Sequence, residues 1–318
     1  MKKLLLFSFL VFAPLFVFAE DVDLARETAA IRAQNEQLAR EISILKAQVQ
    51  TAQALRGRIV VEARDPKIAK EIKERVIWSL MKDPAAVKVA LGDPRAPVVL
   101  NSPLIIRYDE NETRCHTQGG RFSMINGKPS CSVSILVAPH STGKGVTRED
   151  AYKWMIDECL LHEALGHSAC YMRLGGRAAQ LPLWVMEGTA MLYQSPKVLR
   201  SGYVTMNEAM VKSGGLPFSM NQLSTMSDYP PNKDRQKLFY YQSMALADML
   251  VGRITELRGP EANANDYPVI VMEFTLAVRN EGWRAAMQRY AKTFGFDPAM
   301  TAEQLDQKLR EHIEDKKP

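Results

Sequence analysis

The chain has 318 residues, of which 46% are hydrophobic and 24% are charged, so it can bury one large core or two small ones. Its formal net charge is +5, which falls to +3 without Lys2 and Lys3. A net charge this small, with no cluster of basic residues and no interleaved aromatic residues, argues against a nucleic-acid-binding protein.

The first 19 residues have the pattern of a secretory signal peptide. Lys2 and Lys3 precede an apolar run from Leu4 to Phe18, and Ala19 is a small residue at the expected cleavage position. We expect residues 1–19 to be removed and the protein to be periplasmic or secreted. An uncleaved membrane anchor is the alternative, but the run is short for a span of ~20 residues. No later segment is apolar enough to cross a membrane, so no stable span is expected after cleavage.

Residues 20–56 carry a heptad pattern that is typical of a coiled-coil helix. One seam (position d) consists of Leu24, Ile31, Leu38, Leu45 and Ala52, and the other (position a) of Thr28, Asn35, Ile42 and Val49. Glu27 with Arg32, and Glu41 with Lys46, form pairs of opposite charge across two parallel helices. The pattern predicts a homodimer through residues 24–52, and a single amphipathic helix docked on its own globular domain is the alternative.

Residues 57–318 are expected to form one α+β domain. A β-containing half, residues 57–175, leads into an α-rich half, residues 176–318. The patterns predict strands at 59–63, 104–108 and 132–137, a helix at 66–81, turns at 83–84 and 92–94, and almost only helix after Arg148.

Four cysteines follow the predicted signal peptide. Cys115 and Cys131 flank a turn-rich stretch, so in an oxidising compartment they predict a disulfide that closes a hairpin. Cys159 and Cys170 lie about three turns apart on one predicted helix, too far to bridge each other. We expect both to be small buried residues.

The strongest functional signal is the sequence His-Glu-Ala-Leu-Gly-His at residues 162–167. Two histidines that flank a glutamate on an apolar helix can bind zinc beside a general base. The usual spacing is four residues, whereas His162 and His167 are five apart, which is roughly 140° around an ideal helix instead of roughly 40°. The motif therefore requires a helix that is locally widened around Leu165 and Gly166, as in a π-type bulge.

A catalytic zinc site needs three protein ligands, and Glu187 is the candidate for the third. It lies 20 residues after His167, which leaves room for one helix to end at Gly175–Gly176 and for a second helix to pack back against it. Gly188 and Ala190 follow directly and are small enough for another helix to approach closely.

These two segments resemble the gluzincin zinc metallopeptidases, whose third ligand is a glutamate on a second helix. The sequence Pro-Leu-Trp-Val-Met-Glu-Gly-Thr-Ala at residues 182–190 is similar to the third-ligand segment of their peptidase MA-like domains. The five-residue histidine spacing departs from most gluzincins but is similar to the His-Glu-x-x-Gly-His motif of dipeptidyl peptidase III. The resemblance covers residues 65–313, and its specific part is confined to the two motif segments and one later helix.

The resemblance implies a zincin-like fold and a secreted or periplasmic zinc metallopeptidase that acts on a peptide or protein substrate. The Zn²⁺ ligands would be His162, His167 and Glu187. Glu163 would be the general base that takes a proton from zinc-activated water and returns it to the leaving amine. Family members often place an oxyanion-stabilising tyrosine on a later helix, where Tyr240 is the better match and Tyr241 is also possible.

Two further expectations concern the cleft, the first from the same resemblance and the second from residue composition. Residues 132–137 would be the edge strand beside the cleft, where an extended substrate could pair with the sheet. The polar, turn-rich stretch from Ser213 to Lys237 would be a lid.

Two alternatives remain open. Glu158 and His162, and likewise Glu163 and His167, could form acid–histidine pairs at i,i+4 without any metal. The chain could also be a non-catalytic envelope scaffold or interaction protein that keeps a zincin-like fold. Glu163 argues against that reading, because hydrolysis needs a base whereas metal binding does not.

Overall fold

A computed structural model describes residues 21–81, 84–91, 99–100, 102–112, 115–119, 123–125, 128–138, 147, 149–150, 154–259 and 267–316. The expected signal peptide lies outside these residues. The chain divides into two units, Met1–Gln50 and Thr51–Pro318. Within the described ranges, none of the helices has both the length and the apolar character that a membrane span requires.

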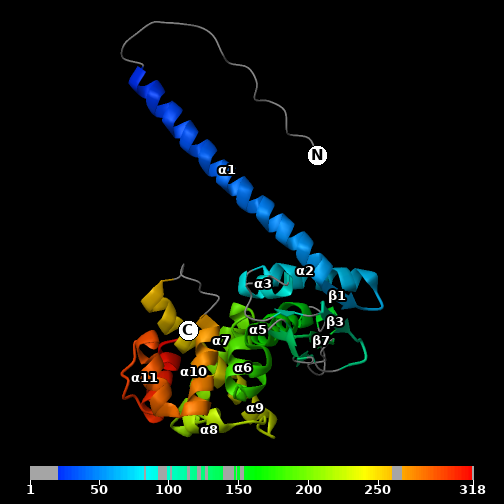
Figure 1. Cartoon of the computed structure of the whole chain (residues 1–318). Helices are drawn as coiled ribbons and strands as arrows, with labels where there is room; N and C mark the ends of the chain where they lie inside the picture. The colour runs from blue at the N-terminus through cyan, green and yellow to red at the C-terminus, as the bar shows by residue number, and fades with distance from the viewer. Residues whose placement is uncertain are drawn as a thin grey trace. The chain divides into compact units, whose positions relative to one another are not determined.

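Helix α1, Asp21–Arg58, makes up the described part of the first unit and continues into the second (Figure 1). Side chains from Thr28 to Gln50 are all exposed. The last turns of α1 belong to the second unit, where Leu55 is fully buried. The heptad residues therefore lie on a helix, as expected.

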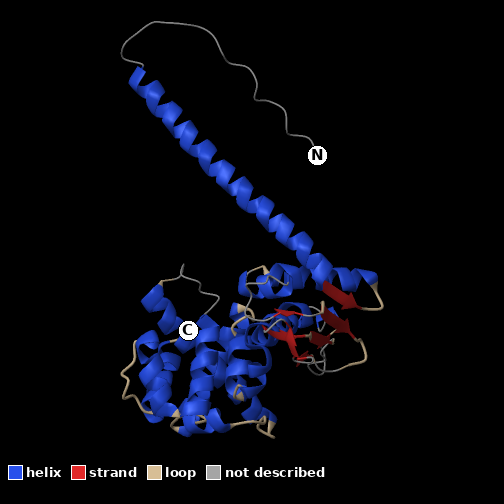
Figure 2. Ribbon diagram, viewed as in Figure 1, coloured by secondary structure: helices blue, strands red, loops and turns tan. Residues whose placement is uncertain are grey.

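A mixed sheet of four strands forms the β part of the second unit, where Figure 2 shows the strands in red. Its order is β1 (Ile59–Glu62), β3 (Leu104–Tyr108), β7 (Val133–Val137) and β4 (His116–Gly119). The first three strands are parallel, and β4 is antiparallel to β7. A second sheet has the order β2 (Val99–Leu100), β6 (Lys128–Cys131) and β5 (Ser123–Ile125).

The predicted place of the edge strand is wrong. Residues 133–137 form β7, which pairs with β3 on one side and with β4 on the other. The edge strands of the described sheet are β1 and β4, and β4 takes the edge next to β7. Sequence patterning missed β4 because its residues, His-Thr-Gln-Gly, are polar and resemble a turn.

Helices make up most of the rest of the second unit, as expected for an α+β chain. In the β-containing part they are α2 (Pro66–Leu80), α3 (Pro84–Leu91), the π-helices η1 (Met155–Cys159) and η2 (His162–His167), α5 (Ser168–Leu174) and the 3₁₀ helix η3 (Gly175–Gln180). The later helices are α6 (Leu183–Met191), α7 (Pro196–Ser213), α8 (Met220–Thr225), α9 (Lys233–Arg258), α10 (Tyr267–Glu281), α11 (Trp283–Phe294) and α12 (Ala302–Asp315).

Two hydrophobic cores hold these elements together. One joins the sheet to α2 and to the helical segment 154–174, with Ile106, Ile135 and Ala164 fully or almost fully buried. The other lies among α6, α7 and α9–α12, with Trp184 and Phe239 at its centre. Because both cores contain residues of the segment 154–191, that segment is fixed from two sides.

The C-terminal helix is fastened by a polar cluster. Asp248 of α9 accepts hydrogen bonds from Tyr203 of α7 (2.5 Å) and from His312 of α12 (3.2 Å), and Lys316 lies 3.7 Å away. Burial would raise the pKa of the Asp248 carboxyl, but the hydrogen bonds and the charge of Lys316 hold it below its ordinary value. The carboxylate therefore contributes stability that is lost in acid.

We predict that Asp248→Asn lowers the free energy of unfolding at neutral pH by about 1–3 kcal/mol, because two partly buried hydrogen bonds lose their charged acceptor. Since the folded-state pKa is depressed, the wild-type contribution is present above the unfolded-state pKa of about 3.9 and disappears as pH falls through the folded-state value. Urea unfolding at several pH values would measure both effects, with Asp315→Asn on exposed α12 surface as control. The prediction would be contradicted if the free energy of unfolding fell equally with decreasing pH in Asp248→Asn and in wild type.

Candidate metal centre

The helix that carries the histidine motif is widened where the spacing requires it. Residues His162–His167 form the π-helix η2, which continues directly into α5. A π-helix bonds residue i to i+5, so residues five apart lie one turn apart on the same face. The predicted bulge around Leu165 and Gly166 is confirmed.

Two side-chain hydroxyls contact the same backbone carbonyl oxygen in the π-helical turn η2. The backbone oxygen of Glu163 accepts a hydrogen bond from Ser168 Oγ (3.0 Å), and Thr117 Oγ1 lies 3.1 Å from it with one hydroxyl hydrogen shared between this oxygen and the Glu163 carboxylate. Thr117 lies on β4, so the edge strand is bonded directly to the motif turn. These contacts compensate for the irregular backbone pattern of a π-helix and stabilise it.

Three ligand atoms converge on one point. His162 Nε2 lies 3.1 Å from His167 Nε2 and 3.1 Å from Glu187 Oε2, and His167 Nε2 lies 3.4 Å from the same oxygen. A tetrahedral zinc ion with bonds of about 2.0–2.1 Å would separate its ligand atoms by about 3.3–3.4 Å. The three observed distances are therefore close to the edges of a zinc coordination tetrahedron.

Hydrogen bonding alone is a poor explanation of this cluster. Two neutral imidazole nitrogens 3.1 Å apart can share only one hydrogen, yet both also approach the same carboxylate oxygen. Within the described structure, Nδ1 of each ring is buried without a hydrogen-bond partner, so neither ring is oriented by a bond on its far side. A cation at the common point satisfies both Nε2 atoms and the carboxylate together.

The electrostatic field at this point favours positive charge. Burial lowers the pKa of His167, but the carboxylates of Glu187 and Glu163 raise it to about 9. Burial would raise the pKa of Glu187, yet the charge of His167 and hydrogen bonds from both histidines hold it well below its usual range. A proton or a metal ion is stabilised there for the same reason.

Glu163 belongs to the same group. Its carboxylate and the two imidazoles offer ligand atoms that lie within 4.8 Å of one another and can hold a metal ion. Glu163 is almost fully buried, and its Oε2 accepts a hydrogen bond of 2.7 Å from Thr117 Oγ1. The alternative in which Glu158 pairs with His162 without a metal does not describe Glu158. Its carboxylate accepts hydrogen bonds from the backbone N–H (3.0 Å) and the hydroxyl (2.5 Å) of Ser195.

Small residues bring Glu187 to the histidines. A Cβ atom on Gly166 would overlap Cα and Cβ of Ala190, so η2 and α6 touch backbone to backbone. One residue after Glu187, a Cβ on Gly188 would overlap the Ser243 carbonyl of α9. Helix α6 is thus in close contact with a neighbour on both sides, and the predicted role of Gly188 and Ala190 as close-packing residues is confirmed.

Tyr229 is a site residue that sequence reasoning missed. Its hydroxyl donates a short hydrogen bond to Oε1 of Glu187, the oxygen that does not face the histidines. It precedes Pro230-Pro231 in the stretch that was predicted as a lid, but no pattern in the sequence distinguishes it from the other tyrosines. Only the fold brings it to the metal centre.

The predicted tyrosine lies beside Tyr229. The ring centroids of Tyr240 and Tyr229 are 5.7 Å apart, and both tyrosines line the cavity that contains Glu163. Burial and the negative charge of Glu187 raise the pKa of both hydroxyls, so both remain donors at neutral pH. Tyr241 lines the outer part of the cleft, with Lys237 Nζ 5.7 Å from its ring centroid.

The metal centre opens into a substantial cleft. A cavity of about 240 Å³ contains both histidines, Glu163 and Glu187, and adjoins a larger one of about 900 Å³. The two share Cys115, His116, His162, Glu163, Tyr229 and Tyr240 as lining residues. The larger volume is in the range of pockets that hold small molecules or short peptide segments.

The predicted disulfide between Cys115 and Cys131 is wrong. Cys115 bonds to Cys159 of η1, with 6.7 Å between their Cα atoms, so Cys159 is a disulfide partner and not only the small buried residue that was expected. Cys131 ends β6 in the second sheet, whereas Cys115 directly precedes β4 in the first. The bond ties the edge strand to the motif segment beside the cleft. Cys170 is buried and free, as expected, and burial raises the pKa of its thiol to about 12.

Comparison with known proteins identifies no relative, since no family model, curated protein or solved structure matches the chain.

We predict that Gly166→Ala lowers the free energy of unfolding by about 1–3 kcal/mol, because the new methyl group forces η2 away from α6. The same displacement would weaken metal binding by separating the histidines from Glu187. Gly252→Ala is the matched control, since that helical glycine has open space around its Cβ position and alanine should add about 0.5–1 kcal/mol. Urea unfolding and zinc dialysis would measure these changes, and a Gly166→Ala protein as stable as wild type would contradict the close contact.

Proposed function

We propose that the protein is a zinc-dependent peptidase in which His162, His167 and Glu187 hold the metal. The observation that carries this proposal is the convergence of two Nε2 atoms and one carboxylate oxygen at 3.1–3.4 Å, beside a second carboxylate. Two imidazoles and a carboxylate are a donor set typical of catalytic zinc sites that leave one position open. When bound there, zinc would supply Lewis acidity and lower the pKa of water.

Glu163 is the general base in this proposal. It lies next to the ligand His162 in sequence, and its Oε2 is held by Thr117, which leaves Oε1 to accept and return a proton. A base so placed typically contributes 10²- to 10⁴-fold to the rate. Glu187 is less suited to this role, because both of its oxygens already accept from Tyr229 or face the histidines.

Tyr240 and Tyr229 divide two further tasks. Tyr229 orients Glu187 through its hydrogen bond to Oε1, as an outer partner does for a metal ligand. Tyr240 lines the cavity with its hydroxyl protonated, and it would donate to the oxygen of the substrate carbonyl as negative charge develops there. We assign Tyr240 instead of Tyr241, because Tyr240 lines both cavities and Tyr241 only the outer one.

The cleft favours a peptide segment as the substrate. Its outer part combines apolar side chains, Trp154, Met191 and Val198, with polar and basic residues of α9. The bonded edge strand β4 reaches the cleft through His116. The Cys115–Cys159 disulfide is the kind of bond that persists in oxidising compartments, which supports a secreted or periplasmic location.

We predict that Glu163→Gln keeps its zinc and loses at least 10²-fold in kcat/KM. Metal content by mass spectrometry and cleavage of a peptide library would be measured on the same samples. Glu158→Gln is the control, since it makes the same change in the same helical segment at a carboxylate that binds Ser195 instead of the cleft. Unchanged hydrolysis in Glu163→Gln would contradict the assigned base. A wild-type protein that binds zinc and cleaves no peptide would instead indicate a scaffold.

A further inference from the structure

The exposed half of α1 carries a continuous apolar seam. We define the α1 seam as the heptad positions a and d, which are occupied by Ile31, Asn35, Leu38, Ile42, Leu45 and Val49. The five apolar members are 47–59% exposed. Single exposed apolar residues are ordinary on protein surfaces, whereas a seam at heptad spacing is not.

The exposed stretch of α1 buries no apolar surface within its own unit. Every side chain from Thr28 to Gln50 is exposed, so this stretch gains nothing from packing inside its own unit. Most helical stability in proteins comes from packing an apolar face against a partner and not from helix propensity. The seam therefore needs a partner surface.

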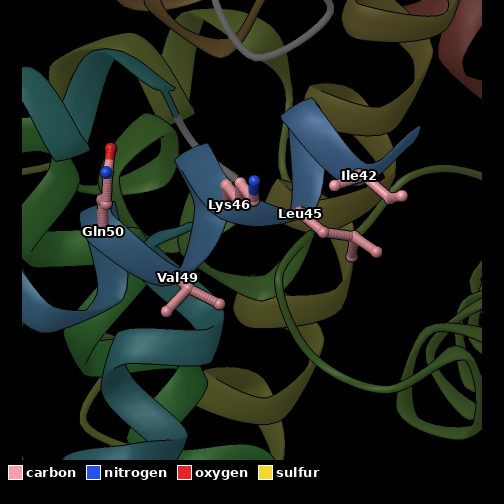
Figure 3. A pocket seen from close by; sticks show the side chains of 5 residues that line it. All are labelled: Ile42, Leu45, Lys46, Val49 and Gln50. Carbon is pink, nitrogen blue, oxygen red and sulfur yellow. The ribbon is translucent and has the colours of Figure 1, made fainter. Parts of the chain in front are cut away.

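The surface of α1 contains a hole of the shape that a coiled coil fills. A hollow of about 380 Å³ is lined by Ile42, Leu45, Lys46 and Val49, and also by Gln50 (Figure 3). These four residues hold heptad positions a, d, e and the next a. In a parallel pair in register, a residue at d faces its own copy, and its neighbours on the facing helix are those four positions. In such a pair, Leu45 of a second chain would insert into this hollow.

Charge and polarity select the parallel orientation. In a parallel pair, Glu41 of one helix faces Lys46 of the other, and Asn35 faces Asn35. In an antiparallel pair with Ile31 opposite Val49, Glu41 would face Glu41, Arg32 would face Lys46, and the Asn35 amide would lie against Leu45. Two like-charge contacts and an unpaired amide disfavour that arrangement.

We propose that α1 associates with α1 of a second copy of this chain as a parallel, in-register coiled coil. Each dimer would then contain two copies of the candidate metal centre and of its cleft. The inference rests on α1 alone and stands whether or not the metal centre hydrolyses peptides.

The first test is the mass of the full chain in solution. Sedimentation velocity of wild type should give a dimer, and Leu45→Glu should give a monomer. Ile44→Glu is the matched control, because Ile44 is adjacent and equally exposed, 57% against 59%, but lies outside the seam. It should stay dimeric, and its metal content and that of Leu45→Glu should equal wild type. A wild-type monomer at every concentration, or equal effects of the two substitutions, would overturn the proposal.

Disulfide trapping tests the orientation. Ile31→Cys and Val49→Cys should each form a covalent dimer on mild oxidation, because a parallel pair places each residue beside its own copy. Arg40→Cys, on the outer face at heptad position f, should show only the background of wild type, whose four cysteines are retained. Cross-linking only when the Ile31→Cys and Val49→Cys proteins are mixed would show an antiparallel pair and overturn the proposed orientation.

Discussion

The rest of the site depends on one constraint, the backbone contact between η2 and α6. Gly166 lets Ala190 approach until no side chain separates the two helices, and this contact brings the Glu187 carboxylate to both histidines. The π-helical turn is the other half of the same constraint, since it returns His167 to the face of His162. Neither feature alone would bring the three ligand atoms together.

Neighbouring contacts stabilise the packing of η2 against α6. Gly188 allows α6 to pack closely against α9, and the Thr117 and Ser168 hydroxyls contact the Glu163 carbonyl oxygen. The Cys115–Cys159 disulfide links the segment before β4 to η1. π-Helical turns are uncommon and occur mostly at functional sites. In this protein, two hydrophobic cores, a disulfide and a carboxylate hydrogen bond surround the π-helical turn η2. This is consistent with a site that must hold four ionisable side chains, those of His162, Glu163, His167 and Glu187, in fixed positions.

The sequence predicted the parts of this arrangement that depend on local pattern. The apolar periodicity gave α2, the Gly-Gly pair at 175–176 lies where α5 ends, and motif spacing identified His162, His167 and Glu187 as neighbours. It failed where tertiary structure decides. The polar residues of β4 gave no strand signal, the pairing of Cys115 depended on which sheet each cysteine joins, and Tyr229 reaches Glu187 only through the path of a loop.

Crystals grown with zinc would show whether a metal ion binds between His162, His167 and Glu187, as we propose. Anomalous difference density at the zinc edge should show one strong peak, with both Nε2 atoms at about 2.0–2.1 Å and a Glu187 oxygen at about 2.0–2.2 Å. Glu163 should approach the peak without ligating it. No peak at this position, or a peak ligated by Glu163 in place of Glu187, would contradict the account.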